Sequence, residues 1–173
     1  LELFDKTILY TDIDLKNDDI FWKKHGEFIL NNKRGYGYWL WKSYIIKKTM
    51  DKLNNGDIIV YSDCGCEIDI TKKQKIIDFF EYVKKDYIIG TYTQIEKKWN
   101  KMDLLLYLDM NKKKYLDSSQ HQGSVIMLLV NNETRYIINE WYRISSNYHM
   151  IDDSPSISKN LDCFREHRHD QSI

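Results

Sequence analysis

Residues 57–67 read DIIVYSDCGCE, a short apolar run that ends in acidic residues. Ile58 to Tyr61 are β-branched or aromatic, which is the composition of a strand buried on both faces. Asp63 and Glu67 follow this strand, with Gly65 between them. Carboxylates at the carboxyl end of a buried strand lie where open α/β sheets bind ligands, and a glycine lets a bulky ligand approach the backbone. The stretch favours a site for a divalent cation that carries phosphates; the alternative is an acidic turn after a core strand.

Helical and strand patterns alternate on both sides of this stretch. Helices are expected over residues 18–30, 38–53, 101–110 and 132–145, and another begins at Thr71, whose spacing from Gln74 is that of a capping box. Strands are expected over residues 6–10, 58–61, 87–92 and 124–130, while residues 147–166 read as irregular. Strands that alternate with helices predict an α/β fold with a mostly parallel central sheet covered on both faces.

The composition indicates one domain without net charge. A chain of 173 residues with 42% hydrophobic and 30% charged residues can bury a substantial core. A formal net charge of +0 gives no electrostatic case for a nucleic-acid partner. The three cysteines argue against a secreted disulfide scaffold and favour reduced thiols in the cytoplasm. No apolar run approaches the roughly 20 residues of a transmembrane helix.

Residues 34–42 read RGYGYWLWK and combine basic, flexible and aromatic residues. We expect Arg34 and a surface-facing Lys42 to contact phosphate beside the start of a helix. Trp39 and Trp41 are two residues apart, so they face different sides of that helix. One of them is then expected in the core and the other is available for a ligand. The alternative is that both tryptophans only pack the helix onto the sheet.

The chain closes with a dense group of imidazoles and carboxylates. Residues 166–172 read EHRHDQS, and residues 151–156 upstream form the acidic turn IDDSPS. Histidines and carboxylates this close together can ligate a metal or move protons. We expect the last segment to fold back toward Asp63; the alternative is a polar C-terminal tail.

Four motifs follow one another along the chain, over residues 34–42, 61–67, 151–154 and 167–172. In this order they resemble small glycosyltransferases of the GT-A type, which occur in bacterial surface-polysaccharide loci and in large DNA viruses. The resemblance runs over nearly the whole chain and implies a single GT-A-like nucleotide-sugar-binding sandwich over residues 1–173. Residues 6–10 would be its second strand, so the first strand of the domain is expected to be missing. The C-terminal end of the domain is expected to be missing as well.

The resemblance implies transfer of a sugar from a nucleotide diphosphate-sugar donor to a glycan or glycoconjugate acceptor, assisted by Mn²⁺ or Mg²⁺. In GT-A enzymes an Asp-x-Asp motif holds the metal, whereas here Gly65 replaces the second acid. The implied metal ligands are Asp63 and His169, with His167 as the alternative histidine. The implied donor contacts are Arg34, Gly35, Tyr38, Trp41, Lys42, Asp63 and Gly65, and the candidates for acceptor binding or proton abstraction are Asp152, Asp153 and Asp170.

The missing second acid and the abundant aromatic residues also suit a non-catalytic module that binds a glycan or a nucleotide. Such a module would bind sugar but would never release nucleotide from a sugar donor. For either class we expect a cytoplasmic location, with peripheral attachment to a membrane as the alternative.

Overall fold

The structure is a computed structural model that describes residues 3–173. Its helices are α1 (Asp12–Lys16), α2 (Asp19–Asn31), α3 (Gly35–Tyr38), α4 (Trp41–Met50), α5 (Lys73–Asp86), α6 (Met102–Tyr107), α7 (Lys113–Leu116) and α8 (Asn132–Ser145). Its strands are β1 (Ile58–Ser62), β2 (Ile88–Ile95) and β3 (Ser119–Leu129), and its short 3-10 turns are η1 (Ile70–Lys72), η2 (Glu96–Lys98), η3 (Tyr148–Met150) and η4 (His169–Ser172). Within residues 3–173, no helix combines the length and the apolar character needed to cross a membrane.

The predicted mostly parallel sheet is wrong, because the strands of residues 3–173 form one antiparallel sheet in the order β1-β3-β2. The central strand β3 pairs Leu129 with Ile58 of β1 and Leu128 with Ile88 of β2. Since β1 and β2 both oppose β3, they run in the same direction, and the chain connects them through α5. β1 and β2 are not paired with each other, so no parallel pair forms between them. Nothing local in the sequence showed that β3 inserts between them.

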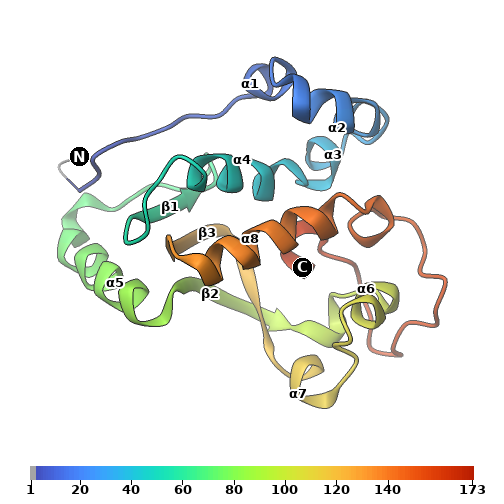
Figure 1. Ribbon diagram of the computed structural model, residues 1–173. Coiled ribbons are helices and arrows are strands. Elements are labelled where there is room, and N and C mark those ends of the chain that lie inside the picture. Colours follow the sequence, from blue (N-terminus) through green and yellow to red (C-terminus); the bar gives the residue numbers. More distant parts are fainter. Residues whose placement is uncertain (1–2) are drawn as a thin grey trace.

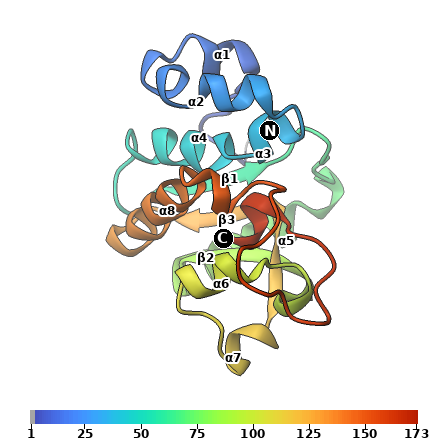
Figure 2. The ribbon, with the colours of Figure 1, turned by 90° about the vertical axis from the view of Figure 1, so that its right-hand side faces the viewer.

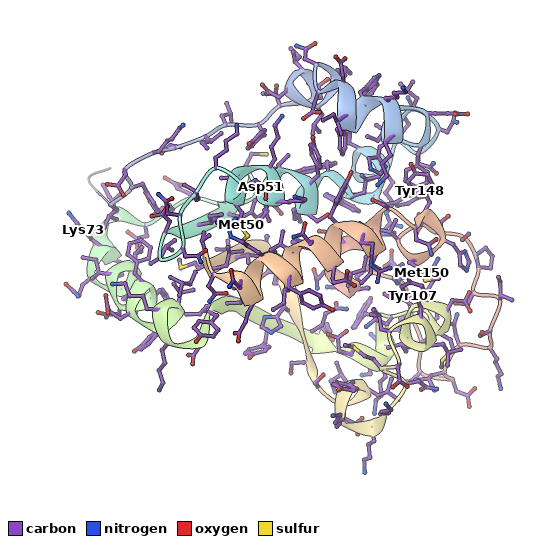
Figure 3. The ribbon with its side chains drawn as sticks, in the orientation of Figure 1. Met50, Asp51, Lys73, Tyr107, Tyr148 and Met150 are labelled. Carbon is purple, nitrogen blue, oxygen red and sulfur yellow. The ribbon has the colours of Figure 1, made fainter. Side chains whose placement is uncertain are left out.

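The main core lies where α4 and α8 pack against each other and against the sheet (Figure 1). Ile45 of α4, Leu128 of β3 and Ile138 of α8 belong to one apolar cluster. Arg135 of α8 also donates a hydrogen bond of 2.8 Å to the carbonyl of Met50 (labelled in Figure 3) at the end of α4. The last carbonyls of a helix lack partners within it, so Arg135 fixes α4 against α8 by supplying a donor.

The helix predicted over residues 132–145 is confirmed as α8. Asn131 caps it: its side chain accepts a hydrogen bond from the amide of Thr134, and Thr134 accepts one from the amide of Asn131. The strand predicted over residues 6–10 is wrong, since these residues form no regular element. Ile8 and Leu9 are 42% and 78% exposed there. An apolar run becomes a strand only where another strand pairs with its backbone, and this run has no such pairing.

The capping box predicted at Thr71 and Gln74 is also wrong. Asp69 caps the preceding turn η1 instead, and its carboxylate accepts hydrogen bonds from both the amide and the hydroxyl of Thr71. The α-helix α5 therefore begins two residues after Thr71, at Lys73, without a side-chain cap. An aspartate two residues upstream competed for the same donors.

The helix predicted over residues 38–53 begins only at Trp41, because the residues before it form a left-handed turn. Residues 35–39, which include α3, all have positive φ angles between 54° and 82°. Left-handed backbone costs roughly 1–2 kcal/mol for each residue with a side chain, and Tyr36, Tyr38 and Trp39 all adopt it. The amide of Trp39 donates to the carbonyl of Gly35 at 3.0 Å and closes the turn.

Candidate functional site

A cavity of about 390 Å³ lies beside the end of β1. Residues 34–42, called the aromatic segment below, contribute Arg34, Trp39 and Lys42 to its walls. The other walls come from Asp63 after β1, from residues 122–124 of β3, and from residues 166–171. The C-terminal segment reaches the cavity because it returns to the middle of the molecule beside β3 (Figures 1 and 2). The prediction that this segment folds back is thereby confirmed, and the alternative of a polar tail is wrong.

Lys42 lies at the centre of the charged groups in this cavity. Its Nζ atom lies 2.8 Å from Oδ2 of Asp170 and 3.6 Å from Oδ1 of Asp63. It also donates a hydrogen bond of 2.9 Å to the carbonyl of Gly123. Lys42 is only 3% exposed, so the expected surface-facing lysine is wrong. Because Asp170 comes from the other end of the chain, no local pattern indicated this burial.

The two carboxylates around Lys42 differ in their surroundings. Asp170 is buried, and its burial raises the pKa of this carboxyl to about 6 although Lys42 acts to lower it. Asp63 is more open, and its Oδ1 accepts a hydrogen bond of 2.5 Å from the Tyr61 hydroxyl. Burial, reinforced by this bond to Asp63, raises the pKa of Tyr61 far above its usual range. The phenol therefore stays protonated and keeps donating to Asp63.

His169 is buried with one ring nitrogen unpaired. Its Nδ1 donates to the carbonyl of Ile151 at 2.7 Å, so the lone pair of the neutral ring lies on Nε2. Burial lowers the pKa of His169, which favours this neutral form. Within residues 3–173, Nε2 has no hydrogen-bond partner and lies 3.6 Å from Oδ1 of Asp153. A lone pair and a carboxylate that face each other at this distance leave room for a donor or a cation.

His167 is placed differently from His169. Its Nε2 donates to the carbonyl of Met150 at 2.9 Å, and its Nδ1 accepts a hydrogen bond of 3.4 Å from the amide of Lys101. Burial lowers the pKa of His167 to about 3, so the ring is neutral. Both ring nitrogens are thus occupied by the backbone. The geometry assigns His167 an anchoring role and leaves His169 as the histidine that can meet a ligand.

Arg34 stands at the edge of the cavity and bridges two acidic side chains. Its guanidinium lies 3.1 Å from Asp153 and 2.6 Å from Glu166, and all three side chains are well exposed. Asp152 points elsewhere: its Oδ1 accepts hydrogen bonds from Lys101 at 3.0 Å and from Ser154. Burial by itself raises the pKa of Asp152, but these bonds outweigh it and lower the pKa below its usual value.

The aromatic segment contributes Trp39 to the cavity, whereas Trp41 was expected there. The ring nitrogen of Trp41 donates to the carbonyl of Gly35 at 3.0 Å, and its ring packs on the core. Tyr38 is buried and stacks on His169, with ring centroids 4.9 Å apart. Gly35 and Tyr38 therefore support the wall of the cavity, and neither lines it. Gly65 is exposed in the loop after β1, also outside the lining.

Sequence reasoning missed Gly123, Trp39 and Arg168 as cavity residues. A Cβ atom on Gly123 would lie 3.3 Å from Nζ of Lys42 and 3.4 Å from Oδ2 of Asp170, so a side chain there would crowd the ion pair. A glycine next to a predicted strand signals such a close approach, but the strand was expected to begin one residue later. Trp39 was missed because both tryptophans were expected on one helix, whereas Trp39 lies in the left-handed turn and Trp41 begins the helix.

The residues fit a divalent cation in part. Among residues 3–173, no group of three or more His, Cys, Asp or Glu side chains stands close enough to share a metal. The buried, unpartnered Nε2 of His169 nevertheless suits a metal ligand, because its Nδ1 is fixed by a backbone carbonyl. Asp63 offers a partly exposed carboxylate at the same cavity. Asp63 and His169 thus both line this cavity.

No protein-family model, no curated protein and no solved structure matches this chain.

Proposed function

We propose that the protein transfers a sugar from a nucleotide diphosphate-sugar to a glycan or glycoconjugate acceptor. The observation that carries this proposal is the meeting of three cationic side chains with three carboxylates in one cavity. Arg34, Lys42 and Arg168 line it together with Asp63, Glu166 and Asp170. Fixed cations bind a diphosphate, and carboxylates accept hydrogen bonds from the hydroxyl groups of a sugar. A ligand that carries both groups satisfies both kinds of side chain.

Lys42 supplies the electrostatic part of the proposed reaction. When the bond between sugar and diphosphate breaks, negative charge develops on the leaving phosphate oxygen. Asp170 and Gly123 already hold the Lys42 ammonium in place, so it can stabilise this charge with little rearrangement. A divalent cation, Mn²⁺ or Mg²⁺, held by Asp63 and His169 would neutralise the same diphosphate charge when bound.

The acceptor is proposed to enter from a second cavity of about 190 Å³. This cavity shares Glu166 and His167 with the first one and is also lined by Asp152 and Asp153. Asp152 is tied to Lys101, whereas Asp153 is 41% exposed and adjoins His169. Asp153 and Asp170 are therefore the carboxylates better placed to contact an acceptor hydroxyl or to accept its proton.

A cytoplasmic location belongs to the proposal as well. Cys64, Cys66 and Cys163 are exposed and carry no disulfide bond. Exposed thiols persist in a reducing compartment such as the cytoplasm.

The test is release of nucleoside diphosphate from a panel of UDP- and GDP-sugars, offered with mixed glycan acceptors in Mn²⁺ or Mg²⁺. We expect one donor to release nucleotide, and Asp170→Asn to slow the release at least tenfold. The matched control is Asp117→Asn, which removes a carboxylate that pairs with Lys97 on the surface. Binding of a donor without any release would instead identify a non-catalytic binding module.

A further inference from the structure

The left-handed turn over residues 35–39 ends on Trp39, at the wall of the cavity. Consecutive left-handed residues with large side chains are unfavourable, and such backbone strain concentrates at functional sites. His169, which lines the same cavity, also has a positive φ angle of 53°. Its ring lies 5.4 Å from that of Trp39, centroid to centroid. Two strained segments from opposite halves of the chain thus meet at one tryptophan.

Trp39 is held in place by contacts with its ring and with the turn that carries it. A Cβ atom at Gly35 would lie 2.3 Å from the Trp39 ring, so the ring rests directly on the glycine backbone. His169 packs on it from the C-terminal segment. Trp41 stabilises the turn, because its ring nitrogen donates a hydrogen bond to the carbonyl of Gly35. A side chain fixed in this way loses little conformational entropy when a ligand stacks on it.

Trp39 is partly exposed and lines the cavity. Its side chain is the one Phe, Tyr or Trp, among the residues that the structure describes, that lines this cavity. Arg34, Lys42 and Arg168 line the same space. A flat apolar wall beside three cations matches a ligand that carries a ring next to its phosphates. Phosphate itself has no flat apolar face that could stack on an indole.

We propose that Trp39 is a preorganised stacking wall for the ring that adjoins the diphosphate of the ligand. This inference rests on the proposed function and deepens it, because it assigns ring recognition to Trp39 and leaves phosphate recognition to the cations. The ring is either the nucleobase or the sugar, both of which present a face that an indole can cover. The two sources are distinguished by which fragment of the donor depends on Trp39.

The experiment is a fluorescence and calorimetric titration of the full chain and three variants, Trp39→Leu, Trp39→Phe and Trp22→Phe. Trp22 is the matched control because it stacks on Tyr36 outside the cavity. The probes are the UDP- or GDP-sugar that most raises the wild-type melting temperature, its nucleoside diphosphate, its sugar 1-phosphate and inorganic pyrophosphate. Circular dichroism and melting temperature report whether each variant is folded.

We expect Trp39→Leu to weaken binding of the nucleotide sugar about tenfold or more, as loss of one stacking contact does. Pyrophosphate binding should stay unchanged, and Trp39→Phe should retain most of the affinity. A loss seen with the nucleoside diphosphate alone assigns the nucleobase to Trp39, and a loss seen with the sugar 1-phosphate alone assigns the sugar. The fluorescence change caused by the ligand should disappear in Trp39→Phe and persist in Trp22→Phe.

Wild-type affinity in Trp39→Leu, or an equal loss of pyrophosphate binding, would overturn the stacking role and leave the proposed function standing. Should Trp39→Leu fail to fold, Trp39→Met takes its place, and wild-type affinity for the nucleotide sugar in that variant would overturn the stacking role equally. If the wild-type chain binds no nucleotide sugar, the proposed function fails, and the stacking role fails with it.

Discussion

Lys42 shows at the scale of one residue how burial changes the role of a charge. An ammonium removed from water keeps its charge only where other groups replace the water, as Asp170, Asp63 and the carbonyl of Gly123 do. The same contacts hold the charge still, which suits it to a diphosphate. The residues next to Lys42 in the sequence, Trp41 and Ser43, could not predict its burial, because every partner of Nζ is distant in sequence.

His25 is a second buried residue whose partners set its behaviour. It is 0% exposed on α2, between Tyr142 and Tyr148. The Tyr148 hydroxyl donates to the carbonyl of Lys24, so it accepts from Nδ1 of His25, while Nε2 accepts from Tyr142. Every polar atom is satisfied with a neutral ring. Burial, with a smaller effect of nearby Lys24, lowers the pKa of His25 to about 4.

We expect His25 to make the fold sensitive to acid. The unfolded chain binds this proton at the ordinary pKa of 6.5 and the folded chain only at about 4. Between these values the unfolded state holds more protons, so stability is full above pH 6.5 and falls as the pH is lowered toward 4. At about 1.4 kcal/mol for each pKa unit, the free energy of unfolding should drop by about 3 kcal/mol from this residue.

Urea denaturation across this pH range measures the effect, with His25→Gln as the variant that cannot titrate. The difference in unfolding free energy between wild type and variant should shrink as the pH falls. His167, whose pKa is also lowered, acts in the same direction in both proteins and cancels in the comparison. A difference that stays constant from neutral pH to pH 4 would contradict the account of His25.

At the scale of elements, the left-handed turn is the least ordinary part of the fold. Its cost is met by packing: Gly37 has a φ of 82°, and a Cβ atom there would lie 2.7 Å from Cγ1 of Ile29 on α2. The turn thus lets two helices approach closely and orients Trp39. Its glycines are needed for space as well as for backbone freedom.

A series of three glycine-to-alanine variants separates the need for space from the need for a left-handed backbone. Gly65→Ala should be close to neutral, because a Cβ atom there meets nothing and the backbone is not left-handed. Gly56→Ala adds only strain, since φ is 100° and the space is open; we expect a loss of about 1–2 kcal/mol. Gly37→Ala adds the clash with Ile29 and should lose more than Gly56→Ala in thermal or urea unfolding. Equal losses for Gly37→Ala and Gly56→Ala would contradict the packing role.

Elements with their own signals were predictable, and those decided by distant partners were not. The helix over residues 132–145 carries a capping residue and an apolar face at helical spacing, and it forms where expected. The run over residues 6–10 has a strand-like composition but no partner, so it stays irregular. The start of α4 is displaced to Trp41 because Gly37 must approach Ile29, a contact between elements.

At the scale of the whole molecule, sequence order and spatial order diverge at the sheet. β3 is the last strand along the chain and the central one in space. Local patterns fix strands but not which strand pairs with which, so a strand–helix–strand pattern reads as parallel neighbours. The cavity likewise brings together residues that are distant in sequence, because its walls come from residues 34–42 and from residues 166–171. The candidate residues Lys42, Asp63, His169 and Asp170 were predictable as types; their contacts with one another were not.

The cavity around Lys42 is proposed to bind the diphosphate of a nucleotide sugar. Asp63→Asn tests it with little risk to the fold, because Asp63 is partly exposed and asparagine can still accept from the Tyr61 hydroxyl. Asp51→Asn is the matched control: Asp51, labelled in Figure 3, is an exposed partner of Lys47 at the end of α4. It lies outside the lining of the cavity.

Calorimetric titration in Mn²⁺ with the nucleotide sugar that best stabilises the wild-type chain measures the claim directly. We expect Asp63→Asn to weaken binding at least tenfold and to remove its dependence on Mn²⁺, because the carboxylate that would carry the cation is gone. Asp51→Asn should bind as the wild type does. Undiminished, metal-dependent binding by Asp63→Asn, or no binding of any nucleotide sugar by the wild type, would contradict the account.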